Sequence, residues 1–225
     1  MSPGPSTHAS APQRALAQQI VEAARLLERR GLICLASGNL SARRGDEWLI
    51  TPSGVAADRL DPEMIVPITA SGQAVGAWQP SSEWPLHRDL YAARAEIGAV
   101  VHTHPPCATA LACLRRDIPP FHYMIARFGG DSVRCADYAC FGSAALSAKV
   151  LSALAGRSAC LMANHGMLVV GRDLDDALAQ SLELEVLCEQ YWRACTLGAP
   201  VLLSADDMAE VHARFARYGQ PLAER

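Results

Sequence analysis

The segment Val100-Val101-His102-Thr103-His104-Pro105-Pro106 joins an apolar run, two histidines and two prolines in a chain of 225 residues. Alternate side chains of a β-strand point to the same face, so His102 and His104 share one face. Proline has no N–H to donate to a neighbouring strand, which ends the strand just after the histidines. The segment therefore predicts a strand end that could present two imidazoles to one metal ion. By itself, such a pair is more commonly a chance His-x-His or two half-buried histidines bonded to backbone.

A third histidine stands at a break between two apolar segments farther along the chain. The run from 158 to 163 predicts a buried strand, Asn164-His165-Gly166 interrupts it, and the apolar pattern resumes at 167–170. A catalytic zinc site commonly has three protein ligands and keeps one position open for water or substrate. His165 is thus a candidate for the ligand that the histidine pair needs.

Three turns rich in small polar residues suit a close approach of backbone to a ligand. They are 35–41, 51–54 and Ser81-Ser82, and they offer hydroxyls and free N–H groups. Each could also be an ordinary turn. Glu83 follows the last of them at an expected helix start, where a carboxylate either stabilises the helix dipole or acts as a metal ligand or base. For His87, one helical turn later, we expect a surface or supporting role.

Composition limits the class of protein. Half of the residues are hydrophobic, 19% are charged and the net charge is −3, which gives no reason to expect a nucleic-acid or membrane partner. The eight cysteines form no Cys-x-x-Cys pair, and Cys34, Cys113, Cys160 and Cys188 lie in apolar segments, as buried reduced thiols would. With no signal-peptide pattern and no apolar run near the length of a membrane span, we expect a cytoplasmic protein.

The coarse pattern predicts one α/β domain over residues 14–225, preceded by a mobile tail at 1–13. Strands and helices interleave without a regular βαβ alternation, which favours a mixed or antiparallel sheet covered by helices. The expected helices are 14–30, 82–95 with Ser82 as N-cap, 141–155 and 173–197, followed by a last one from 204. The expected strands are 48–50, 64–68, 73–77, 97–101, 133–138, 158–163 and 167–170.

Five short motifs, in this order, resemble the class II aldolase/adducin family. They are Ser37-Gly38-Asn39, Thr51-Pro52-Ser53-Gly54, Ser81-Ser82-Glu83, His102-Thr103-His104 and Asn164-His165-Gly166. The resemblance extends from about residue 16 to residue 219. Within the family, the chain is most similar to the members that act on L-fuculose 1-phosphate. Further segments share that pattern: 121–126, Gly129-Gly130, Tyr138-Ala139, Phe141-Gly142 and Tyr218-Gly219.

The resemblance implies a fold and a set of roles. The fold would be a single-domain three-layer αβα sandwich with a mixed, largely antiparallel central sheet. His102, His104 and His165 would bind Zn²⁺, with Glu83 as a fourth ligand, although Mn²⁺ or Co²⁺ would also suit these ligands. Tyr123 would serve a neighbouring subunit's site as an acid, and Tyr218 would close over the site, in a cyclic homotetramer. The substrate's phosphate would lie among Gly38, Asn39, Ser53, Gly54, Ser81 and Ser82.

The implied reaction is reversible cleavage of a ketose 1-phosphate to dihydroxyacetone phosphate and a small aldehyde. L-Fuculose 1-phosphate, 5-deoxyribulose 1-phosphate and 5-methylthioribulose 1-phosphate are the candidate substrates, and Glu83 would be the acid–base group. Arg127 and Phe128 are larger than the residues expected after Tyr123, so the accepted aldehyde could differ from lactaldehyde. Three alternatives stay open: a sugar-phosphate 4-epimerase, a methylthioribulose-1-phosphate dehydratase, and a non-catalytic adducin-like interaction domain.

Overall fold

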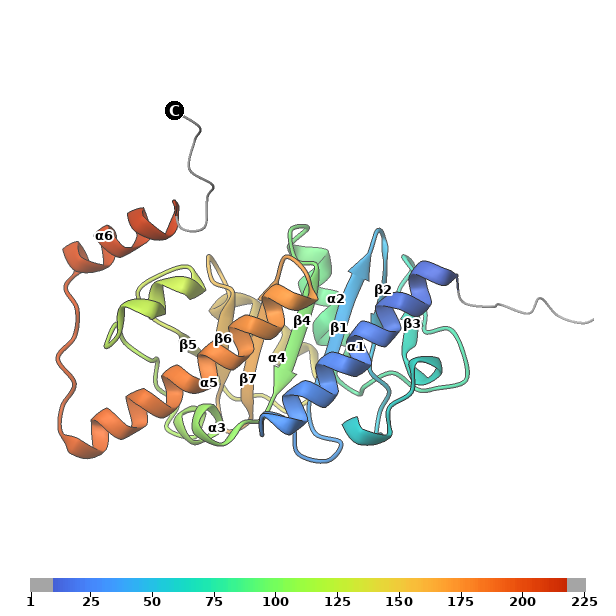
Figure 1. Ribbon diagram of the computed structural model, residues 1–225, viewed down its shortest axis with the longest axis horizontal. Coiled ribbons are helices and arrows are strands. Elements are labelled where there is room, and N and C mark those ends of the chain that lie inside the picture. The colour runs from blue at the N-terminus through green and yellow to red at the C-terminus, as the bar shows by residue number, and fades with distance from the viewer. Residues whose placement is uncertain (1–9, 218–225) are drawn as a thin grey trace, which may run out of the picture.

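The computed structural model describes residues 10–217, which form one seven-stranded sheet with helices on both faces (Figure 1). The strand order is β3-β2-β1-β4-β7-β6-β5, and each neighbouring pair is antiparallel except β5–β6. The sheet is therefore mixed and largely antiparallel, as predicted. Its strands are β1 Asn39–Arg44, β2 Glu47–Ile50, β3 Val66–Ile68, β4 Ala99–Thr103, β5 Arg134–Ala136, β6 Ala159–Met162 and β7 Gly166–Gly171.

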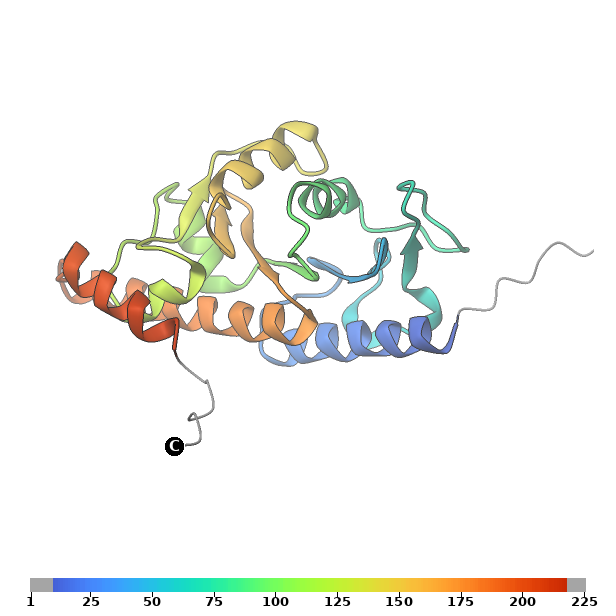
Figure 2. The same ribbon diagram turned by 90° about the horizontal axis from the view of Figure 1, so that it is seen from above.

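The helices form two layers, one on each face of the sheet. Helices α1 and α5 lie along one face, and α2 and α4 lie on the other (Figure 2). The apolar side chains accordingly divide into two buried clusters, so the sheet is the middle layer of an αβα sandwich. The helices are α1 Ala11–Arg29, α2 Trp84–Ala93, α3 Pro106–Ala112, α4 Ala144–Ala153, α5 Leu174–Leu197 and α6 Ala205–Phe215, with the short 3₁₀ helices η1 Ala57–Arg59, η2 Pro62–Met64 and η3 Tyr123–Phe128.

Strand β4 lies in the middle of the sheet and determines where His102 points. Ala99 and Val101 belong to the cluster under α1 and α5, whereas Val100 belongs to the cluster under α2 and α4. Alternation along the strand places His102 on the same face as Val100. His102 therefore faces the layer that contains α2, and Glu83 is the N-cap residue of that helix.

The beginning of the domain differs from the prediction. Helix α1 starts at Ala11, inside the segment that we predicted as a tail over residues 1–13. Ser10 caps it, because its side-chain oxygen accepts a hydrogen bond from the backbone N–H of Gln13 at 3.3 Å. The sequence pattern missed this start because the apolar spacing becomes regular only after the first helical turn.

Other boundaries also need correction. Glu83, and not Ser82, is the N-cap residue of α2. The strand predicted at 73–77 is reduced to an isolated bridge at Ala74, and a strand that was not predicted occupies 39–44.

The cysteines also differ in part from expectation. Cys160 and Cys188 are buried as expected, but Cys34 and Cys113 are exposed, and all eight thiols are free. Across residues 10–217, no helix combines the length and the apolar character that crossing a bilayer requires.

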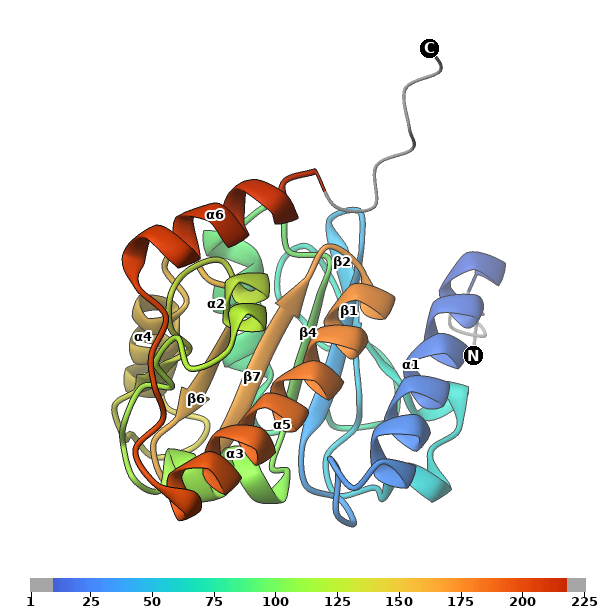
Figure 3. The ribbon, with the colours of Figure 1, turned by 60° about the vertical axis from the view of Figure 1, so that its left-hand side comes forward.

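The C-terminal helix α6 packs beside η3 rather than on the central sheet (Figure 3). Its capping box joins Ser204 and Asp207, whose side chains each bond the other's backbone N–H. The ring of Phe215 near its end stacks on the ring of Tyr123, with centroids 6.5 Å apart. The last described residues therefore lie close to Tyr123, and Tyr218 lies outside the described residues.

Candidate metal centre

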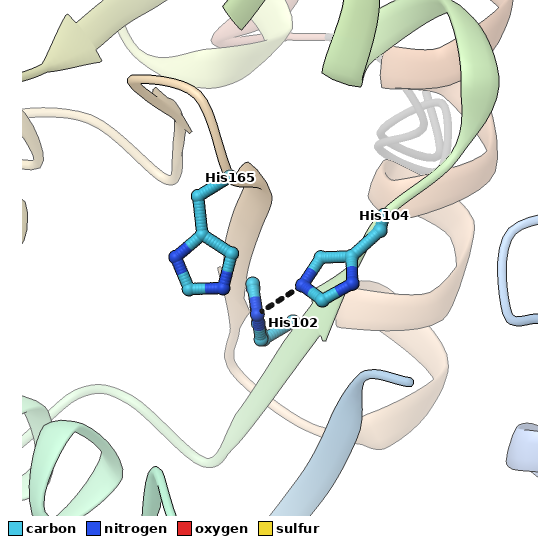
Figure 4. Close-up of side chains that lie close together, drawn as sticks. All are labelled: His102, His104 and His165. Atoms are coloured by element: carbon cyan, nitrogen blue, oxygen red, sulfur yellow. Dashed lines mark hydrogen bonds between the residues drawn. The ribbon is translucent and has the colours of Figure 1, made fainter. Parts of the chain in front are cut away.

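Three imidazoles meet at the end of β4 (Figure 4). His102 is in β4, His104 follows the strand, and His165 lies in the turn between β6 and β7. Their ring centroids are 4.7 to 4.9 Å apart, and one nitrogen of each lies within 4.8 Å of the others. The structure thus brings together the three histidines singled out from the sequence.

The β6–β7 turn has backbone requirements that explain its sequence. Asn164 has φ +53°, a left-handed conformation that asparagine tolerates better than most residues. A Cβ on Gly166 would lie 2.5 Å from the carbonyl oxygen of Thr103 and 2.6 Å from Cδ2 of His104. Gly166 therefore permits the close approach of β7 to the end of β4, and with it the position of His165 beside His104.

The donor set fits a divalent cation. His102 Nδ1 donates to the carbonyl oxygen of Met167 at 2.8 Å, so Nε2 is the nitrogen that faces the cluster and would bind a cation. His104 Nε2 lies 2.9 Å from His102 Nε2, a separation that requires a proton or a cation between the two nitrogens. Glu83 Oε1 is buried and accepts no hydrogen bond from any residue of 10–217. Three imidazole nitrogens and a carboxylate oxygen suit zinc or a similar ion.

Glu83 interacts with two of the histidines. Its Oε2 lies 3.0 Å from His102 Nε2, and its Oε1 lies 3.6 Å from His165 Nε2. Burial by itself would raise the pKa of Glu83, but the charge and hydrogen bond of His102, with His165 and Asn39, hold that pKa well below its usual range. The carboxyl is therefore ionised and can act as a ligand or as a base.

The three imidazoles differ in charge. Burial lowers the pKa of His102, but the charge and hydrogen bond of Glu83 outweigh burial and raise it overall. Burial, together with the charge on His102, lowers the pKa of His104 to about 4 and also lowers that of His165. At neutral pH His104 and His165 are therefore neutral, as a metal ligand must be.

A cavity of about 250 Å³ opens beside the cluster. Glu83, His104 and His165 form one part of its wall, and small-residue turns form most of the rest. All the residues expected at the phosphate lie in that wall: Gly38, Asn39, Ser53, Gly54, Ser81 and Ser82. The structure therefore joins the predicted phosphate residues and the imidazoles in one space, while their roles stay predictions.

The first of these turns lies directly against β4, the strand that contains His102. Gly38 has φ +92°, and a Cβ there would lie 2.8 Å from the carbonyl oxygen of His102. Asn39, the next residue, is the direct cross-strand neighbour of His102 in the β1–β4 ladder. A turn that approaches the metal ligands this closely needs glycine at position 38.

Tyr123 lies elsewhere on this chain. It begins η3, it is 51% exposed, and it is absent from the cavity wall. An exposed tyrosine can reach a second copy of the chain, so its expected role in a neighbouring site stays a prediction. Tyr218, the other expected site tyrosine, lies outside residues 10–217 and has no described position.

Sequence reasoning missed one residue of the cavity wall and left the position of His87 open between the surface and a supporting role. Phe141, which the sequence marks only as part of a motif, is 65% exposed and lines the cavity. His87 is fully buried, and its Nε2 lies 2.6 Å from Asn39 Oδ1. This burial contradicts the surface alternative that the sequence left open, and the supporting role stays a prediction.

Comparisons with known proteins agree with this geometry. The sequence model of the class II aldolase and adducin N-terminal domain matches residues 18–192. A 5-methylthioribulose-1-phosphate/5-deoxyribulose-1-phosphate aldolase of Rhodospirillum rubrum is 49% identical over 91% of this chain and 93% of its own length. The L-fuculose phosphate aldolase of Escherichia coli K12 is 40% identical over 93% of this chain and 98% of its own length.

Similarity extends to solved structures. An L-fuculose 1-phosphate aldolase superposes with a TM-score of 0.87 at 35% identity, covering 94% of this chain and 100% of the other. The domain model and these relatives match most of the chain. The similarity therefore extends over the whole αβα fold and is not limited to one motif. The chain belongs to the class II aldolase and adducin family.

Proposed function

We propose that this protein is a metal-dependent aldolase that reversibly cleaves a ketose 1-phosphate to dihydroxyacetone phosphate and a small aldehyde. The observation that carries the proposal is the single cavity in which imidazoles, an ionised carboxylate and small-residue turns meet. A non-catalytic interaction domain would have no need for this combination. The names of the 49% and 40% identical relatives support the same reaction class.

The turns provide the binding site for the phosphate group. Ser53, Ser81 and Ser82 bring hydroxyls to the cavity wall, and Gly54 brings backbone without a side chain. Oriented N–H and hydroxyl groups can hold a phosphate without a lysine or arginine. This arrangement explains how a chain with a net charge of −3 can bind a phosphorylated sugar.

His102, His104 and His165 would hold the metal ion, for which we propose Zn²⁺. When bound, such an ion supplies Lewis acidity, which stabilises negative charge on the substrate oxygens as the C3–C4 bond breaks. Neutral imidazoles leave the full charge of the ion available for this purpose. Glu83 would complete the ligand set until substrate displaces it.

Glu83 is the acid–base group in this proposal. Its Oε2 accepts a hydrogen bond from Asn39 at 3.1 Å, whereas its buried Oε1 accepts none from the described residues. Oε1 is therefore the oxygen that can take a proton from C3 of dihydroxyacetone phosphate, and return one in the cleavage direction. A positioned general acid or base of this kind contributes about 10²–10⁴ in rate.

Tyr123 would give a proton to the aldehyde oxygen in a neighbouring subunit of a homotetramer. Its exposure on this chain is what such a role needs. Tyr218 would close over the site from the C-terminal segment. The tetramer and the cytoplasmic location stay predictions, and the mass of the protein in solution tests the first of them.

The test is a cleavage assay with three substrates. Metal-loaded protein is incubated with 5-methylthioribulose 1-phosphate, 5-deoxyribulose 1-phosphate and L-fuculose 1-phosphate, and dihydroxyacetone phosphate is detected by coupled reduction. Because the 49% identical relative is named for the first two compounds, we expect the highest kcat/KM with one of them. Release of triose phosphate from none of the three would refute the proposal. Inversion at C4 without triose phosphate would indicate an epimerase, and loss of water a dehydratase.

A further inference from the structure

A series of buried polar side chains, each hydrogen-bonded to the next, runs from Glu83 away from the cavity into the layer beneath α2. Asn39 Nδ2 lies 3.1 Å from Glu83 Oε2, and Asn39 Oδ1 lies 2.6 Å from His87 Nε2. His87 Nδ1 lies 2.6 Å from Ser41 Oγ, which lies 2.8 Å from the hydroxyl of Tyr91. Each of these residues is at most 6% exposed. Burying such a series of polar groups is unfavourable in free energy unless every hydrogen bond in it is made.

The direction of each hydrogen bond follows from the carboxylate. An ionised carboxylate only accepts, so Asn39 must present its NH₂ group to Glu83 and its carbonyl oxygen to His87. That carbonyl oxygen requires a proton on Nε2 of His87, which leaves Nδ1 as an acceptor for the hydroxyl of Ser41. Ser41 Oγ is then free to accept from Tyr91. All donors in the chain therefore point toward Glu83.

The surroundings hold His87 in this state. Trp48 stacks on its ring at 6.4 Å between centroids, with the two planes 13° apart. Burial lowers the pKa of His87 to about 3, so the ring stays neutral and carries one N–H. Burial likewise raises the pKa of Tyr91, which keeps its hydroxyl protonated as the first donor of the chain.

We infer that His87 is a positioning residue: its Nε2–H fixes the amide of Asn39, and Asn39 in turn holds Oε2 of Glu83 while facing the cavity. Asn39 has a second N–H on the same nitrogen, and it lines the cavity expected to take the phosphate. Without the hydrogen bond from His87, the side-chain amide of Asn39 could turn and present its oxygen to the carboxylate of Glu83 and to the substrate's phosphate. His87 would thereby influence both phosphate binding and the base, although it lies outside the cavity wall.

Two amide substitutions separate this role from simple packing. In His87→Gln the terminal NH₂ lies at about the reach of Nε2 and can donate to Asn39. In His87→Asn the shorter side chain reaches about as far as Nδ1 and can contact only Ser41. Ile20→Val in α1, a buried position on the other face of the sheet, is the control for lost stability alone.

For its kinetic consequence the inference rests on the proposed aldolase function. With metal-loaded protein we expect His87→Asn to lower kcat by about 10- to 100-fold and to raise KM, since loss of a group that orients a metal-site residue costs about this much. His87→Gln should recover most of both losses, and Ile20→Val should change neither. A His87→Asn protein with kcat within two-fold of wild type, or no recovery in His87→Gln, would overturn the inference.

A second measurement does not depend on the reaction. The affinity of each metal-loaded variant for inorganic phosphate is measured by calorimetry, with thermal unfolding recorded alongside. We expect about five-fold weaker binding in His87→Asn, the loss of roughly one hydrogen bond, with recovery in His87→Gln. If no ketose phosphate is cleaved but this pattern appears, the proposed reaction is wrong and the positioning role stands. Equal phosphate affinity in all four proteins would refute that role.

Discussion

Gly166→Ala should weaken metal binding although it replaces none of the metal ligands. The added Cβ would lie 2.5 Å from Thr103 O and 2.6 Å from His104 Cδ2, against 3.4 Å for ordinary contact. The first contact must therefore lengthen by about 0.9 Å, and the atom in the way is backbone of β4. Metal–ligand distances tolerate only about 0.2 Å of change, so the imidazoles of His104 and His165 can no longer both fit.

The expected cost has two parts. Displaced ligands should lower metal affinity by about 10- to 100-fold, as loss of ligand-orienting contacts does. The inserted methyl should also lower the free energy of unfolding by about 1–3 kcal/mol, as overpacking does. Metal affinity is measured by competition with a chelator, and stability by thermal unfolding of the metal-free protein.

Gly198→Ala is the matched control. A Cβ at Gly198 meets nothing within 4 Å, and its φ of 161° is extended backbone that any residue adopts. We expect it to bind metal as the unsubstituted protein does. If Gly166→Ala also binds metal with unchanged affinity, the close approach of β7 to His104 does not determine the geometry of the site.

Three further predictions concern the reacting groups. Glu83→Gln should lower kcat by about 10²–10⁴ while at least part of the metal is retained, and turnover near that of wild type would remove Glu83 from the base role. Tyr123→Phe should lower kcat by about 10² or more with unchanged metal content, whereas an unchanged rate would exclude Tyr123 as the acid. In the metal-free protein His104 has its pKa lowered to about 4 and His165 has its pKa lowered too, while that of His102 is raised. At a pH above the two lowered pKa values and below the raised one, metal binding should therefore displace about one proton, so affinity rises with pH with a logarithmic slope of about one; a slope of two or three there would contradict these shifts.

The metal site was largely accessible to sequence reasoning because strand geometry is local. A His-x-His at the end of an apolar run places both rings on one side, and His165 interrupts a second apolar run. The local pattern does not predict that β7 pairs with β4, and this pairing brings His165 close to His102 and His104. That pairing depends on contacts between residues more than sixty positions apart in the sequence. The grouping of His165 with the other two histidines was therefore predicted from the family resemblance.

Strand β1 was missed because two of its four buried positions are polar. Asn39 and Ser41 face inward, where apolar residues are the usual signal for a strand. Their partners are His87 and Tyr91, more than forty residues away, so nothing local marks them as buried. The same distance effect hid the burial of His87. A rule based on apolar periodicity predicts polar residues to be exposed, so it is wrong for polar residues that are buried because they support a functional site.

The most direct test of the central claim is a metal titration of the metal-free protein with the cleavage rate recorded at each step. The claim is that His102, His104 and His165 hold the ion that makes this cavity an aldolase site. We predict that release of dihydroxyacetone phosphate from 5-methylthioribulose 1-phosphate or 5-deoxyribulose 1-phosphate rises in proportion to added Zn²⁺ and levels off at about one ion per chain. His104→Ala should give no rise. Full activity in metal-free protein, or the same titration curve in His104→Ala, would contradict the claim.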